Sequence, residues 1–377
     1  MKKLHQLAGT FAMSMCAVAN AADTVRVAAV LELSGASSVS GINFKRGVDL
    51  AVEQINAQGG VLGKQIDLAT LNTGSDVQAA ARLATQAVNQ KAVAVFGPAT
   101  SDSVLASMAV IQQAHIVHFI GAEAAAITAQ ANPYIFRTSF TQATTMPKVA
   151  SYISRIAKSK SLSIIYADNG FGRGGNALIK EALGRTRTAI VADVAAQPGQ
   201  ADFSVPVRAA IAANPDAIFV YTNENEAAGI LVELHRQGWR KPIIGETVLA
   251  SQKVIDTVGH AADGVIAHVG LTAAAPAAPV QSYRVSYEAR YHDVPDHSAM
   301  KGYSGVYLWK AAVERAGRFD SSAVAQALHT TKFKTSEYPG VLADVEYDDK
   351  GDLNRESYVV EVKNGMQEVV VLLEKAE

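Results

Sequence analysis

The stretch that decides the fold reads VRVAAVLEL (25–33), then FKRGVDLAVEQINAQGG (44–60), then QIDLATL (65–71). The first and third segments are short and apolar, as buried strands are. The middle segment has apolar residues at helical spacing and closes with Gly59-Gly60, a signal that ends helices. A strand, a crossover helix and a second strand form the unit of a parallel sheet, so this stretch predicts an α/β fold.

The same alternation continues along the chain in two series. The first series predicts helix 77–89, strand 93–96, helix 102–114 and strand 116–120. The second series opens after residue 140 and predicts helix 147–157, strand 162–166, helix 176–183, strand 190–194, helix 207–213, strand 217–221 and strand 242–245. An Ala-Pro segment at 273–279 reads as a crossing between lobes, and it precedes helices 280–291 and 303–316 and a strand pair around Tyr347 and 358–362.

Length and composition restrict the class of protein. The 377 residues exceed what one core of about 250 to 300 residues holds, so two lobes are expected. A net charge of −1 without a long basic run argues against a nucleic-acid partner. Cys16 is the only cysteine and is expected to leave with a cleaved N-terminal segment, so neither a disulfide nor a thiol nucleophile is predicted.

Residues 1–22 have the pattern of a secretory signal peptide. Lys2 and Lys3 precede a short apolar run at 7–18, and Ala19-Asn20-Ala21 supplies a cleavage pattern. The run is shorter than the roughly 20 residues of a membrane anchor. A core helix and a lipid attached at Cys16 are the alternatives, and the residue before Cys16 is a methionine where a lipoprotein has a small residue. An exported protein is therefore expected.

Enzyme motifs are scarce. The nine histidines include no His-Glu-x-x-His, and no Gly-x-Ser-x-Gly occurs, so neither a metal nor a covalent hydrolase site is predicted. Gly170–Gly175 does match the dinucleotide pattern Gly-x-Gly-x-x-Gly, with Asp193 near the expected acidic position. An exported dinucleotide-dependent enzyme is thus one hypothesis. A glycine-rich loop that faces a ligand crevice without any cofactor is the favoured interpretation.

Candidate binding residues follow the predicted strand ends. Ser101 comes after strand 93–96, where its hydroxyl can hold a ligand carboxylate or only cap a helix. The loop 121–124 follows the next strand and should face the same crevice. Glu246 is the matching carboxylate of the second series, with an ordinary surface glutamate as the alternative.

Several motifs together resemble one family. They are Leu33-Ser34-Gly35, GVDLAVEQINAQGG (47–60), Phe96-Gly97-Pro98, Phe136-Arg137-Thr138, the turn 168–172 and DDKGD (348–352). Over essentially the whole chain after residue 22, the sequence resembles the type I periplasmic solute-binding proteins of ABC transporters, in the leucine/isoleucine/valine-binding group.

The resemblance implies two doubly wound, Rossmann-like lobes joined by a three-segment hinge that closes on a ligand. The first lobe would hold 23–142 and 271–354, and the second 143–270 and 355–377. It also implies a periplasmic, monomeric binding protein that delivers its ligand to a membrane permease, without catalysis or cofactor. A ligand sensor that docks to a membrane receptor shares the fold and stays open as an alternative.

By position, the resemblance assigns roles to four residues of the cleft. Ser101 would hold the ligand's α-carboxylate with help from the backbone of Ala122, Phe171 would replace a tyrosine of the second lobe, and Glu246 would receive an α-ammonium.

Three positions depart from the amino-acid binders of the group. Ala124 replaces a threonine, Asn223 a second tyrosine and Ser40 an aromatic residue, while Glu123 and Arg173 are expected to add charge at the rim. An amino acid is the leading ligand class, and a carboxylate without an amine, such as an aromatic acid, is the alternative.

Overall fold

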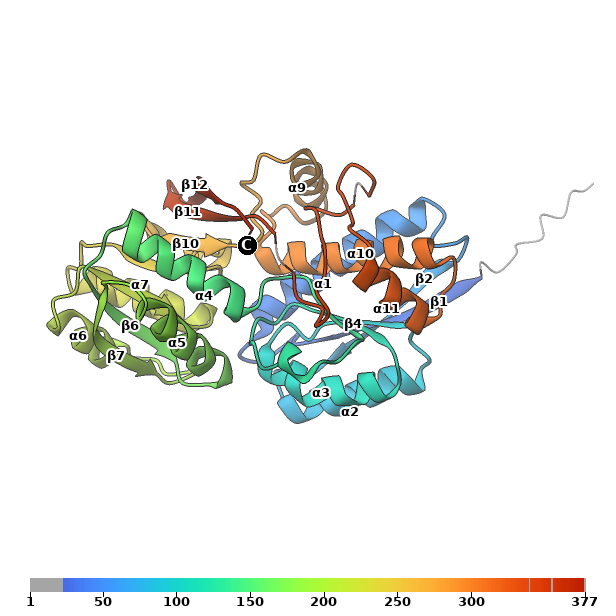
Figure 1. The fold of residues 1–377 in the computed structure, drawn as a ribbon, viewed down its shortest axis with the longest axis horizontal. Helices are drawn as coiled ribbons and strands as arrows, with labels where there is room; N and C mark the ends of the chain where they lie inside the picture. The colour runs from blue at the N-terminus through green and yellow to red at the C-terminus, as the bar shows by residue number, and fades with distance from the viewer. Residues whose placement is uncertain (1–22, 339, 354, 376–377) are drawn as a thin grey trace, which may run out of the picture.

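The computed structural model describes residues 23–338, 340–353 and 355–375. Two lobes lie side by side along the long axis of the molecule, and each is built on its own sheet (Figure 1). The predicted signal peptide at 1–22 lies outside the described residues. Within the described ranges, no helix is both long and apolar enough to cross a membrane.

The sheet of the first lobe is parallel throughout. Its order β2-β1-β3-β4-β5 is that of a flavodoxin-like doubly wound sheet. The strands are β1 (Thr24–Leu31), β2 (Gln65–Asn72), β3 (Ala94–Phe96), β4 (Val117–Ile120) and β5 (Ile135–Arg137). Most of the β1, β3, β4 and β5 side chains are buried, because helices cover both faces of the sheet.

The helices of the first lobe come from both ends of the chain. They are α1 (Ser38–Ala57), α2 (Val77–Asn89), α3 (Ser101–Gln113), α9 (Ala278–Tyr291), α10 (His297–Ala316) and α11 (Ser321–Thr330). The backbones of α1 and α10 touch: a Cβ added at Gly47 would lie 1.9 Å from the Ala299 carbonyl oxygen, and one at Gly302 would lie 2.1 Å from that of Phe44. This contact joins the C-terminal helices to the N-terminal βαβ unit.

The second lobe repeats the winding and adds an antiparallel edge. Its sheet order is β12-β11-β10-β9-β8-β6-β7, in which β6 to β10 are parallel and β11 and β12 are antiparallel. The strands are β6 (Ser161–Ala167), β7 (Ala189–Ala196), β8 (Ala217–Tyr221), β9 (Ile243–Glu246), β10 (Ile266–Val269), β11 (Ser357–Lys363) and β12 (Met366–Leu373). The helices are α4 (Gln142–Ser151), α5 (Gly170–Leu183), α6 (Ser204–Ala212), α7 (Glu224–Arg236) and α8 (Gln252–Val258).

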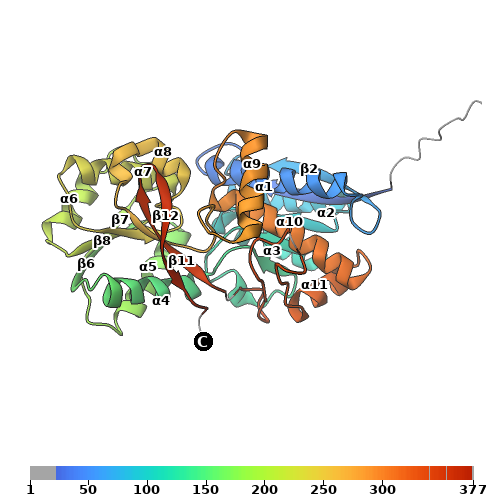
Figure 2. The same ribbon diagram turned by 90° about the horizontal axis from the view of Figure 1, so that it is seen from above.

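The chain passes between the two sheets three times. It leaves the first sheet after β5, returns after β10 to helices packed on α1, and enters the second sheet again at β11. The Ala-Pro segment 273–279 leads from β10 into α9, as Figure 2 shows between the lobes. The residue limits of each lobe given above stay a prediction.

Two sequence-based predictions of local structure are wrong. Gly170–Gly175 forms the first turns of α5 and is no loop, because Asn169 caps the helix by accepting from the Gly172 N–H at 2.8 Å. Packing requires two of these glycines, since a Cβ at Gly172 would lie 1.9 Å from the Ala167 carbonyl oxygen and one at Gly175 would lie 2.1 Å from the Tyr221 ring. The strand expected around Tyr347 is only an isolated bridge to Leu353, and β11 pairs instead with β12.

The contact between α1 and α10 generates a test of stability. We expect Gly47→Ala to lower the free energy of unfolding by at least about 2 kcal/mol, because the new methyl group would meet backbone atoms that cannot move alone. Gly184→Ala is the matched control: Gly184 is exposed at the end of α5 with a φ of −58°, and a Cβ there makes only ordinary contacts at 3.4 Å. Urea denaturation measures both, and equal stability of the two variants would contradict the packing argument.

Candidate functional site

A cavity of about 180 Å³ lies where the carboxyl ends of strands from both sheets meet. In each doubly wound sheet the winding reverses between two strands, β1 and β3 in the first lobe and β6 and β8 in the second. The segments that follow these four strands all line the cavity. Ligands bind at such switch points, so the topology of both lobes directs a ligand to the same place.

Five of the seven predicted site residues line this cavity. They are Ser40, Ser101 and Ala122 of the first lobe and Phe171 and Asn223 of the second. Ala124 contributes through its backbone, because its N–H donates to Ser101 Oγ at 3.2 Å. Glu246 lines a smaller chamber that adjoins the cavity through Glu123, His297 and Lys301, which border both.

Ser101 is the first residue of α3 and does not act as its cap. Thr100 occupies the N-cap position, and its hydroxyl donates to Glu32 Oε1 at 2.6 Å. Buried Glu32 also accepts from the Ala99 N–H at 3.1 Å, so this carboxylate fixes the turn that leads into α3. Ser101 thus lies at the positive end of a 13-residue helix and lines the cavity, an arrangement that suits a carboxylate.

A buried guanidinium shapes the adjoining loop. Arg137 donates from Nη1 to the Ala122 carbonyl at 2.6 Å and from Nη2 to that of Ala124 at 2.7 Å. Its Nε donates to Asp352 Oδ1 at 2.5 Å, which supplies the counter-charge. Burial lowers the pKa of Arg137, and Asp352 opposes that shift. The loop is thus held in one shape beside Ser101.

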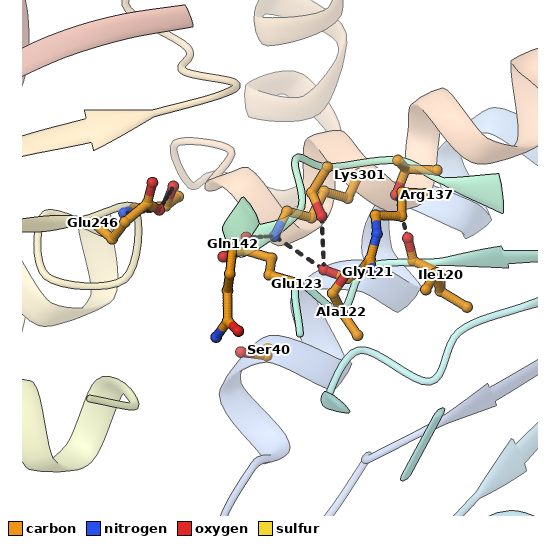
Figure 3. Close-up of polar contacts among 12 residues, drawn as sticks. Ser40, Ile120, Gly121, Ala122, Glu123, Arg137, Gln142, Glu246 and Lys301 are labelled. Atoms are coloured by element: carbon orange, nitrogen blue, oxygen red, sulfur yellow. Dashed lines mark hydrogen bonds and ion pairs between the residues drawn. The ribbon is translucent and has the colours of Figure 1, made fainter. Parts of the chain in front are cut away.

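Glu123 and Lys301 form a largely buried ion pair in the first lobe (Figure 3). Lys301 Nζ lies 2.7 Å from Glu123 Oε1 and donates to the Gly121 carbonyl at 3.1 Å. Burial raises the pKa of Glu123, and the charge of Lys301 opposes the shift. The prediction that Glu123 lies at the rim is wrong, because the fold turns its side chain inward to meet α10.

Sequence reasoning missed Lys301 and its neighbour His297, which lie one turn apart on α10 and both border the cavity. Burial and the charge of Lys301 hold the pKa of His297 well below its usual value, so His297 is neutral. Their spacing of four residues was the available signal, since residues i and i+4 share a helix face.

Glu246 is paired within the second lobe. Its Oε1 lies 2.5 Å from His268 Nδ1, and its Oε2 accepts from the Thr247 N–H and hydroxyl, both at 2.9 Å. The pairing follows from the sheet, because Glu246 on β9 and His268 on β10 are parallel-strand partners. Burial opposes ionisation, yet the charge of His268 and these hydrogen bonds outweigh it and lower the pKa of Glu246.

Glu224, the first residue of α7, is the other functional carboxylate that sequence reasoning missed. Its Oε1 accepts from Ser40 Oγ at 2.5 Å, a hydrogen bond that spans the two lobes. Among the described residues, no Lys, Arg or His forms an ion pair with it. Its place shortly after β8 could have identified it, because Ser101 and Glu246 were also chosen as polar residues that follow a strand end.

The second-lobe wall is aromatic and polar. Phe171 stacks on Tyr221 with ring centroids 4.4 Å apart, and Gln142 Nε2 donates both to the Phe171 carbonyl at 2.8 Å and to the Tyr221 hydroxyl at 2.9 Å. Asn223 is the N-cap residue of α7, but its side chain makes no cap hydrogen bond. Arg173, expected at the rim, is exposed and paired with Asp168 at 2.6 Å.

The sequence has recognisable relatives. The profile of the family described as "Periplasmic binding protein" matches residues 24–367. The "Leucine-, isoleucine-, valine-, threonine-, and alanine-binding protein" of Pseudomonas aeruginosa is 23% identical over 342 residues, which cover 90% of this chain and 90% of that protein.

Solved structures agree with the observed fold. The branched-chain amino acid transporter substrate-binding protein LivJ of Streptococcus pneumoniae, in complex with isoleucine, has a TM-score of 0.84 and 25% identity and covers 94% of this chain and 100% of that one. A solute-binding protein of Rhodopseudomonas palustris BisB5, in complex with 3,4-dihydroxybenzoic acid, has a TM-score of 0.85 and 22% identity. The match covers 94% of this chain and 98% of that one. The predicted type I periplasmic binding fold is confirmed, and the chain belongs to the periplasmic binding protein family.

Proposed function

We propose that this protein is the periplasmic substrate-binding component of an ABC importer and captures a small amino acid between its lobes. It acts without catalysis or cofactor, as a monomer, and presents the closed complex to a membrane permease. The ligand class follows from one observation: the cavity wall of one lobe suits an anion, and that of the other lobe suits a cation. Ser101 and the start of α3 favour an anion, and Glu224 lines the same cavity and forms no ion pair with a cation of the described ranges.

A zwitterion matches that placement. Its carboxylate would bind Ser101 in the first lobe, and its ammonium would bind the carboxylates of the second lobe, with Glu224 at the cavity and Glu246 in the adjoining chamber. Contacts made to both lobes at once exist only after closure, so the ligand stabilises the closed arrangement by its differential affinity. The relative that binds leucine, isoleucine, valine, threonine and alanine supports this ligand class.

A carboxylate without an amine is the second candidate. Glu123 is already paired with the ammonium of Lys301, and Glu246 is already bonded to the imidazole of His268, which leaves fewer carboxylates for a ligand ammonium. The structural neighbour with bound 3,4-dihydroxybenzoic acid supports this alternative. Titration calorimetry with leucine, threonine, alanine, benzoate and 3,4-dihydroxybenzoate separates the two classes, and heat of binding from none of them would contradict the proposal.

The first prediction concerns the carboxylate end of the ligand. We expect Ser101→Ala to weaken binding of the tightest ligand in that series at least several-fold, because a donor to an enclosed carboxylate is lost. Ser107→Ala on the same helix is the control, since Ser107 is buried but bonds only to main-chain carbonyls of its own helix. Calorimetry measures both affinities, and an unchanged affinity of Ser101→Ala would remove Ser101 from the site.

The second prediction concerns the ammonium end. We expect Glu224→Gln to weaken amino-acid binding about tenfold or more, in line with loss of a charge-assisted hydrogen bond. The deaminated analogue 4-methylpentanoate should bind the variant and the parent equally, since it has no ammonium for Glu224 to hold. If Glu224→Gln weakens the binding of both compounds equally, Glu224 stabilises the contact between the lobes and does not bind the ligand ammonium.

A further inference from the structure

Arg355 is a buried cation, and one edge of its guanidinium has no hydrogen-bond acceptor among the described residues. The residue precedes β11 in the third crossing between the lobes and is 8% exposed. Among the described residues, nothing accepts a hydrogen bond from Nε or Nη2, and water does not reach either nitrogen. These two atoms form one edge of the guanidinium, the edge that binds a carboxylate in bidentate fashion.

Other arginines of this chain show what that edge ordinarily binds. Arg236 donates from Nε and from Nη2 to the two oxygens of Glu233, both at 2.6 Å. Buried Arg137 has its Nε on Asp352 and both terminal nitrogens on oxygen acceptors. A buried guanidinium with unmet donors is costly, so an acceptor for Arg355 would lower the free energy of the molecule.

A second cation, Lys148, lies beside Arg355. Lys148 donates to the Arg355 carbonyl at 3.2 Å, and both side chains lie over the Phe140 ring, at 5.1 Å for Lys148 Nζ and 5.4 Å for the guanidinium carbon. Burial lowers the pKa of Lys148 to about 8, and the charge of Arg355 adds to that shift. Both groups lack a carboxylate in hydrogen-bond contact among the described residues, so their charges are available to an anion.

Arg355 lines two hollows, the small chamber that holds Glu246 and, at the hinge, a cavity of about 340 Å³. Its apolar wall includes Leu271, Val280, Leu342 and Tyr358. The carboxylates Asp344, Glu346 and Glu356 also border it, together with Lys332 and Lys375, and Glu346 lies 3.7 Å from Lys332. The volume is in the range of small-molecule sites, which combine apolar walls with a few polar groups.

We propose that this hinge cavity is a second binding site, for a small organic carboxylate with an apolar body, whose carboxylate occupies the Nε and Nη2 edge of Arg355. The apolar body lies against Leu271, Val280 and Leu342. Because both nitrogens are covered in this arrangement, side chains of the cavity wall move aside as the carboxylate enters. The site shares Arg355 and Leu271 with the chamber that holds Glu246, but it shares neither Ser101 nor Glu224 with the cavity between the lobes, so Ser101→Ala separates it from the proposed function.

Benzoate is the probe, and benzamide is the neutral control of the same shape. We expect calorimetry to detect benzoate binding to the wild type and to Ser101→Ala alike, and benzamide to bind at least tenfold more weakly. Arg355→Lys keeps the charge but removes the fork, and should lower benzoate affinity at least tenfold. Ala343→Phe fills the cavity without changing Arg355 and should also abolish benzoate binding. This second variant keeps the test valid if Arg355→Lys fails to fold.

Three results with the wild type and the hinge variants would overturn the hinge site. They are no binding of benzoate to the wild type, equal binding of benzoate and benzamide, and full affinity retained in both Arg355→Lys and Ala343→Phe. Loss of benzoate binding in Ser101→Ala alone would place the compound in the cleft, which would overturn the hinge site and leave the proposed function intact.

Discussion

The cleft wall of the first lobe depends on the buried guanidinium of Arg137. It holds the carbonyls of Ala122 and Ala124 and so determines the shape of the loop that carries Glu123 and faces Ser101. Asp352, which neutralises it, comes from the segment that leads to the third crossing. One interaction thus links the loop after β4 to the C-terminal part of the lobe. A loop held in this way presents preorganised groups to a ligand and loses little entropy when the ligand binds.

Charge in the cleft is arranged in pairs within each lobe, and Glu224 makes a polar contact between the lobes. Glu123 with Lys301 and Glu246 with His268 are internal pairs, whereas Glu224 reaches across the cleft to Ser40. Pairing offsets the free-energy cost of removing these charged groups from water, and it orients the side chains that contact a ligand. The contact between Glu224 and Ser40 is made only when the lobes are together, so it belongs to the closed arrangement.

Much of the fold could be predicted from local patterns. Apolar runs such as 217–221 coincide with a strand, because a strand buried on both faces is continuously apolar. Predictions failed where packing overrides local signals: the glycines of α5 suggested a loop but serve close contact with Tyr221, and Tyr347 lies in a bridge and not in a strand. Ser101 and Phe171 could be assigned to the cleft, because parallel strands end at the same edge of each sheet.

The sequence by itself determined the α/β class, the two series of alternating strands and helices, and the loops that carry the cleft residues. These follow from periodicity and strand ends, which are local properties of the chain. Only the tertiary structure decided which charges meet. Lys301 pairs with Glu123, which is 178 residues away in the sequence, and Ser40 donates to Glu224, which is 184 residues away. Such pairs depend on how helices and sheets pack. The same holds for the guanidinium edge of Arg355, which has no acceptor in the described part of the chain, because no local sequence pattern records whether a buried cation has a partner.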